Sequence, residues 1–82
     1  MHVTDITYLD GDGPTLARFS VAFDTDLILH GLQLRVAEDG SLRTHPPHAR
    51  RLARAYGISM PLSQKLTDLA IAALAERGVV VR

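Results

Sequence analysis

The stretch Leu16-Ala-Arg-Phe-Ser-Val-Ala-Phe23 alternates between apolar and more polar side chains along its length. Its odd positions carry Ala17, Phe19, Val21 and Phe23, and its even positions carry Leu16, Arg18, Ser20 and Ala22. A period of two is typical of a β-strand that is buried on one side only. The stretch therefore predicts a strand over 16–23 whose Phe19 side packs on the core.

Three further segments predict strands of the same sheet. Residues 3–9 are rich in β-branched side chains, residues 27–37 alternate again, and residues 41–45 return after the hairpin signal Glu38-Asp39-Gly40. Turn-forming residues separate the strands at 10–14, 24–26 and 38–40. Short connections of this kind predict an antiparallel meander.

The alternation within 27–37 predicts which side chains face the core. One side carries Ile28, His30, Leu32, Leu34 and Val36, and the other carries Gly31, Gln33 and Arg35. Because the first side is the apolar one, we expect it to be buried. His30 is then expected to be a partly buried core histidine with its ring satisfied by neighbours.

The last segment predicts a helix over about 64–77, laid across the sheet face that carries Phe19 and Val21. Its apolar stripe, at a spacing of three and four, consists of Leu66, Leu69, Ala70, Ala73 and Leu74. Ser63 is the expected N-cap, and Gly78 is the expected stop signal. The fold class predicted is α+β: a small antiparallel β-meander sheet with a C-terminal helix packed on it, as one domain over 1–82.

Two segments leave alternatives open. Pro46-Pro47 ends the fourth strand, and residues 48–56 then fit either a short helix between the sheet and the final helix or an ordered loop. Residues 79–81 are three valines, which fit either a short added strand or an exposed apolar tail.

Length and composition favour a small cytoplasmic protein that associates with itself. A chain of 82 residues supports one thin core, and no cysteine is present to reinforce it with a disulfide or a thiolate metal site. We therefore expect a homodimer. No apolar run approaches the roughly 20 residues that cross a bilayer, and the N-terminus lacks the layout of a secretory signal. These features predict no membrane partner and a cytoplasmic location.

The basic residues are concentrated in the second half of the chain. Nine Lys and Arg residues balance nine Asp and Glu residues overall, but the segment 48–54 holds Arg50, Arg51 and Arg54 and no acid. Guanidinium groups suit phosphate oxygens, so the cluster is a candidate nucleic-acid contact, with Arg43 and Lys65 as auxiliaries. The alternative is a solvated face whose arginines pair with carboxylates.

The order of these landmarks resembles the SpoVG family (stage V sporulation protein G, also called putative septation protein). The matching segments are Val3–Ile6, Ala17–Phe23, Leu27–Leu34, Asp39–Leu42, Pro47–Arg51 and Met60–Ser63. The resemblance implies a curved antiparallel sheet, a homodimer formed through strands, and DNA or RNA binding in bacterial regulation. It also implies that Arg50, Arg51 and Arg54 belong to the binding surface. The chain departs from the family in its alanine- and leucine-rich final helix.

Other residues with chemical potential favour structural interpretations. His45 and His48 flank two prolines, which splay the side chains apart, so we predict no metal site there or at His30. Asp24 and Asp26 fit a solvated turn better than a pair of acid–base carboxylates. We therefore predict no catalytic residues, no cofactor and no enzyme.

The leading hypothesis is a SpoVG-like, dimeric nucleic-acid-binding regulator. The alternative is a small protein-interaction or assembly module whose arginines meet an acidic protein partner. The sequence does not distinguish DNA from RNA.

Overall fold

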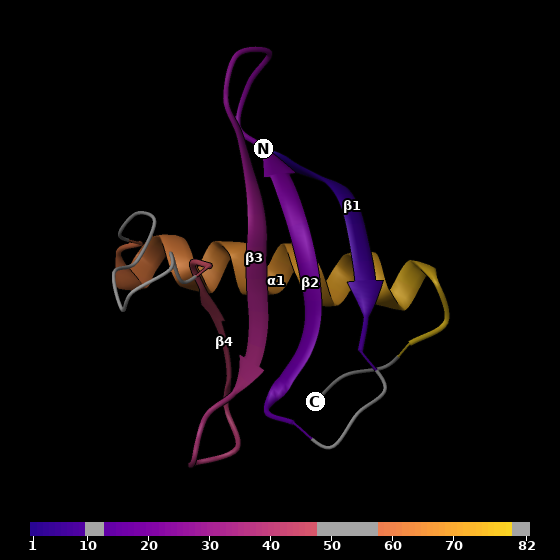
Figure 1. The fold of residues 1–82 in the computed structure, drawn as a ribbon, viewed down its shortest axis with the longest axis vertical. Helices are drawn as coiled ribbons and strands as arrows, with labels where there is room; N and C mark the ends of the chain where they lie inside the picture. Colours follow the sequence, from indigo (N-terminus) through magenta and orange to yellow (C-terminus); the bar gives the residue numbers. More distant parts are fainter. Residues whose placement is uncertain (10–12, 48–57, 80–82) are drawn as a thin grey trace.

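The protein is a four-stranded antiparallel sheet with a single described helix across one of its faces (Figure 1). The computed structural model describes residues 1–9, 13–47 and 58–79. The elements are β1 (His2–Tyr8), β2 (Thr15–Ala22), β3 (Ile28–Val36), β4 (Leu42–His45) and α1 (Met60–Glu76). The strands pair in chain order, and their bounds agree with the predicted ones to within one residue. The α+β meander is thus confirmed, while the segments 10–12, 48–57 and 80–82 lie outside the described residues.

The core lies between the sheet and α1. Its buried apolar residues are Ile6, Ala17, Phe19, Val21, Leu32, Leu34, Leu66, Ala70 and Leu74. The predicted helix stripe is confirmed, because Leu69 and Ala73 also pack partly against this cluster. Within the described residues, no helix has both the length and the apolar character needed to span a membrane.

A β-bulge in β3 changes which side chains face the core. Phe19 pairs with Leu32 but Val21 pairs with Leu29, so two residues of β3 stand opposite Ser20 alone. One of the two is Gly31, whose φ of 75° is a conformation that L side chains rarely adopt. The extra residue reverses the alternation, and Leu29 packs against the core.

The predicted core positions Ile28, His30 and Val36 are therefore wrong. All three are exposed, and His30 is not a buried core histidine. Ile28 and His30 lie at the N-terminal end of β3, before the chain has passed the bulge, where the extra residue turns them to the face opposite the core. Val36 is the last residue of β3.

The helix starts four residues earlier than the sequence predicts. Ser59 is the N-cap, with its side chain accepting a hydrogen bond from the Leu62 N–H, and Pro61 occupies the first turn, where its missing N–H costs nothing. The prediction of Ser63 as N-cap is wrong. Ser63 is buried inside the helix, and its Oγ donates to the Thr44 carbonyl at 2.9 Å and accepts from the Thr44 N–H at 3.3 Å.

The two ends of α1 occupy backbone groups on opposite edges of the sheet. At β4, the Ser63 hydroxyl bonds both outward-facing groups of Thr44. At β1, the Arg77 guanidinium donates to the Ile6 carbonyl at 2.7 Å. The predicted stop is confirmed, since Gly78 has a φ of 82° and the Gly78 and Val79 N–H groups bond back to Ala75 and Leu74.

Candidate nucleic-acid interface

The predicted binding residues fall in different parts of the molecule. Arg50, Arg51 and Arg54 lie outside the described residues, so their proposed role stays a prediction. Arg43 is exposed on β4, and Lys65 is exposed on α1. Arg43 lines a small pocket at the β4 edge together with α1 residues such as Met60 and Gln64, but Lys65 is not part of that pocket.

Strand register brings together arginines that are distant in the sequence. Arg18 of β2 pairs with Gln33 of β3, which pairs with His45 of β4. Two residues further along β3, Arg35 pairs directly with Arg43. Each of these residues has a buried neighbour in its strand and therefore projects from the sheet face opposite α1.

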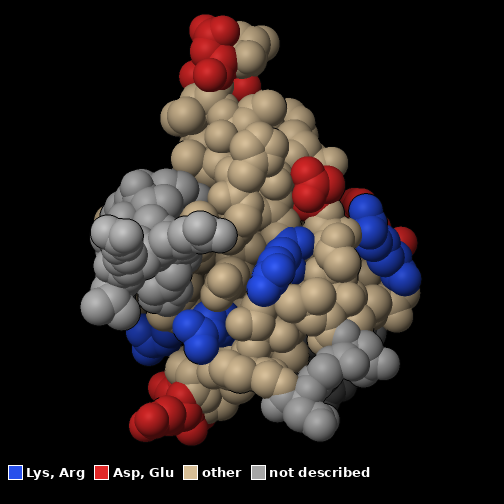
Figure 2. All heavy atoms as spheres, viewed as in Figure 1, with Lys and Arg blue, Asp and Glu red and all other residues tan. Residues whose placement is uncertain are grey.

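We call this surface the arginine face and define it by Arg18, Gln33, Arg35 and Arg43. Figure 2 looks onto it and shows Lys and Arg side chains across its middle and lower parts, with Asp and Glu side chains at the tips of the β2–β3 and β3–β4 hairpins and also over β1, beside the basic side chains. Within residues 1–9, 13–47 and 58–79, no carboxylate lies within 4.0 Å of a nitrogen of the three guanidinium groups. Within the described residues, the three guanidinium groups are thus not neutralised by ion pairs.

Sequence reasoning identified Arg43 but missed Arg18 and Arg35. The sequence does indicate that both side chains are exposed, since each occupies a polar position in a strand with alternating polarity. Isolated arginines on separate strands become a cluster only when the register is known.

The turn before β4 orients Arg43. Its Nε makes a long 3.5 Å contact with the Ser41 hydroxyl, which donates to the Asp39 carboxylate at 2.6 Å. The Ser41 N–H donates to the same carboxylate at 2.9 Å. The Ser41 side-chain and backbone hydrogen bonds lower the pKa of Asp39 below its ordinary value, and the charge of Arg43 adds a smaller effect. The contact uses Nε of Arg43 and leaves both Nη groups for another acceptor.

His30 and Asp24 make hydrogen-bond contacts that have structural roles. His30 Nδ1 lies 3.1 Å from the hydroxyl of buried Ser20. Asp24 accepts hydrogen bonds from the N–H groups of Asp26 and Leu27, at 2.7 and 2.9 Å, and so holds its turn. His48, the second histidine of the predicted pair, is not described. Among the residues that are, no group of three or more His, Asp or Glu side chains is placed to hold a metal ion.

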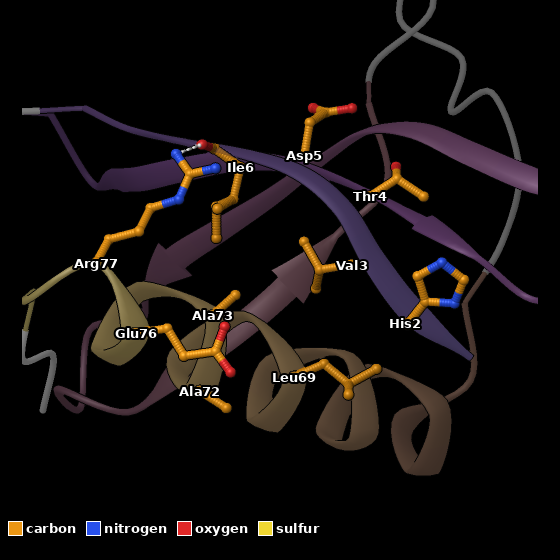
Figure 3. Close-up of a pocket in the computed structure, with 10 residues that line it drawn as sticks. All are labelled: His2, Val3, Thr4, Asp5, Ile6, Leu69, Ala72, Ala73, Glu76 and Arg77. Carbon is orange, nitrogen blue, oxygen red and sulfur yellow. Dashed lines mark hydrogen bonds between the residues drawn. The ribbon is translucent and has the colours of Figure 1, made fainter.

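A groove of about 310 Å³ runs between β1 and α1 (Figure 3). Val3 points from β1 towards α1 and Leu69 lies opposite on the helix, whereas Asp5 points away from the helix. Arg77 lines one end of the groove and already donates to the Ile6 carbonyl. The groove also contains Glu76, so it has no uniform charge that would select an anion.

Comparison of the chain with models of known protein families, with curated proteins and with solved structures finds no match. The resemblance to the SpoVG family therefore stays a hypothesis.

Proposed function

We propose that the protein binds nucleic acid through the phosphate backbone, with the arginine face as its contact surface. The observation that supports this proposal is the gathering of Arg18, Arg35 and Arg43 from three neighbouring strands onto one exposed side of the sheet. Guanidinium groups are permanently charged and bond phosphate oxygens with two parallel N–H groups. Since the chain has no net charge, the attraction is local to this face.

Arg50, Arg51 and Arg54 are further phosphate contacts in the proposal. They follow β4 within a few residues, after Pro46-Pro47. Phosphate contacts position a protein on nucleic acid without reading its sequence, so the proposal covers DNA and RNA alike. A cytoplasmic regulator of the SpoVG type fits this activity.

The proposed unit is a homodimer that pairs through a sheet edge. β1 is the better edge, because it has seven residues against the four of β4, and Ser63 already bonds both outward groups of Thr44 on β4. Among the described residues, the outer edge of β1 is contacted by Arg77, whose guanidinium donates a hydrogen bond to the Ile6 carbonyl. Arg77→Ala should therefore strengthen the dimer, as measured by light scattering during gel filtration. A monomer in both proteins would reject the pairing.

The binding test is an anisotropy titration of labelled DNA and RNA at several salt concentrations. Three phosphate contacts from Arg18, Arg35 and Arg43 of each copy, six in all, predict a log–log salt slope of about −5, and further contacts from Arg50, Arg51 and Arg54 would make the slope steeper. The variant Arg50→Ala/Arg51→Ala/Arg54→Ala should bind more weakly with a shallower slope. Lys65→Ala, on the helix side, should have a smaller effect. The absence of binding at low salt would reject the function.

The second candidate function is a protein-interaction module with an acidic protein partner. It is favoured by the exposed Leu27 and Ile28, which are 50% and 45% accessible at the β2–β3 hairpin. A protein that fails to bind nucleic acid, and whose binding to a purified partner is lost in Leu27→Ser/Ile28→Ser, would support this candidate instead.

A further inference from the structure

We propose that Arg35 and Arg43 form a clamp for neighbouring phosphate groups, so that the arginine face recognises a linear phosphate chain whether or not it carries bases. This inference rests on the proposed function and narrows its ligand: inorganic polyphosphate should occupy the same site as nucleic acid.

The register places the two arginines side by side. The Ala37 N–H donates to the Ser41 carbonyl, which makes these two residues a hydrogen-bonded pair, and the Arg35–Arg43 pair two residues further on is of the same kind. The Cα atoms of such a pair are about 5.5 Å apart, with both side chains on the same face. Arg18 lies diagonally across from Arg35, through its own partner Gln33.

The pairing has an energetic consequence. Like charges directly opposite one another on neighbouring strands destabilise a sheet, and the described residues place no carboxylate against this pair within 4.0 Å. An anion bound between the guanidinium groups removes that repulsion. The Ser41 hydroxyl also holds Arg43 at Nε, which reduces the freedom that the side chain must lose on binding.

Among the described residues, the arginine face carries no Phe, Tyr or Trp ring on which bases could stack, and its aromatic groups are imidazoles such as that of His45. Phe19 is buried in the core and Phe23 packs against it. Tyr8 lies two residues from buried Ile6 on β1 and so shares its side of the sheet, facing away from the arginines. Single-strand binding proteins use exposed aromatic rings to hold bases. With Tyr56 outside the described residues, the face offers guanidinium groups and polar side chains, which suit phosphates.

The test compares the wild-type protein with Arg35→Gln/Arg43→Gln and with Lys65→Gln as a control. Inorganic polyphosphate should raise the Tm of the wild-type protein and displace labelled DNA in the anisotropy assay. The double variant should lose both effects, with affinity reduced about tenfold or more, as expected when charge-assisted hydrogen bonds are removed. Its Tm without polyanion should equal or exceed that of the wild-type protein, because the repulsion is gone. Lys65→Gln, which removes a cation from the helix side, should lower the affinity for polyphosphate and for DNA much less than the double variant does.

Each other outcome is decisive. If DNA binds but polyphosphate does not compete, and the double variant binds DNA normally, the clamp is wrong and nucleic-acid binding resides elsewhere, for example at Arg50 and Arg51. If polyphosphate binds at the clamp and DNA does not, the clamp stands and the proposed function is overturned. If neither binds, both are rejected.

Discussion

Two adjacent residues of β2 belong to opposite surfaces of the same sheet. Phe19 is 1% accessible and packs under α1, whereas Arg18 is exposed on the arginine face. The helix-covered face consists of apolar side chains and buried hydroxyls, and the arginine face presents cations from three strands. The difference separates two roles: the helix-covered face supplies most of the buried apolar core, and the arginine face is the surface that we propose for ligand binding.

The largest expected effect comes from breaking the helix-covered face. Phe19→Ala should destabilise the protein by about 3–5 kcal/mol, through lost burial and a cavity. That is comparable to the total stability that so small a core provides, so much of the chain should be unfolded. Arg18→Ala is the matched control, expected to change stability by less than about 0.5 kcal/mol. Urea unfolding followed by circular dichroism measures both, and equal losses would contradict the division between the faces.

The next effect concerns the buried hydroxyls between β4 and α1. Ser63→Ala leaves the outward N–H and carbonyl of Thr44 without their partner, at a cost of about 1–3 kcal/mol. Thr44 and Thr67 share a hydrogen bond of 2.9 Å between their hydroxyls. Replacing both with Val removes donor and acceptor together, so the double variant should cost less than the sum of the single ones. A double-mutant cycle in urea measures this coupling, and strict additivity would show that the hydroxyls do not act as a pair.

A smaller loss of stability is expected at the β3 bulge, which determines which side chains of β3 face the core. Gly31→Ala places a Cβ at φ 75°, which costs roughly 1–2 kcal/mol, and that atom would also lie 3.2 Å from the Pro47 Cβ. Gly40→Ala has the same backbone penalty at φ 85° but meets nothing within 4 Å. The difference between their unfolding free energies therefore reports the contact of Pro47 with β3. Equal values would mean that Pro47 moves aside without cost.

The sequence predicted the fold well where one local pattern decided it. The alternation around Phe19 and the stripe through Leu66 and Ala70 both identify the core correctly. Prediction from the sequence was less reliable in β3, where the bulge reverses the alternation of buried and exposed side chains. Gly31 carries the only local sign of the bulge, and the apolar residues around it fit an uninterrupted strand equally well. For the helix start, two serines were available, and Pro61 favours Ser59 because proline is best placed in the first turn.

The candidate site was less predictable than the fold. Arginines adjacent in the sequence drew attention to residues 48–54, whereas Arg18 and Arg35 are isolated among apolar neighbours. Their proximity to Arg43 depends on register across β2, β3 and β4, which turns and a bulge determine jointly. Local patterns identify the exposed side of each strand, but they do not establish which exposed residues meet.

The smallest expected effect sharpens the comparison at the rim of the arginine face. Asp39 is exposed, and the hydrogen bonds from Ser41 lower its pKa below its ordinary value, ahead of the smaller effect of the Arg43 charge. A carboxyl whose pKa is lower in the folded protein stabilises it above the unfolded pKa, and this contribution is lost as the pH falls through the folded pKa. Ser41→Ala should therefore raise the pKa of Asp39 in an NMR titration, and its stability difference from the wild-type protein should shrink in acid.

Arg43→Gln provides the decisive companion to that titration. Because Arg43 is a lesser cause of the lowered pKa, its removal should raise the pKa of Asp39 less than Ser41→Ala does. The opposite order would mean that Arg43 interacts mainly with the Asp39 carboxylate. Arg43 would then not be available to bind a phosphate group, and the clamp would be reduced to Arg35 alone.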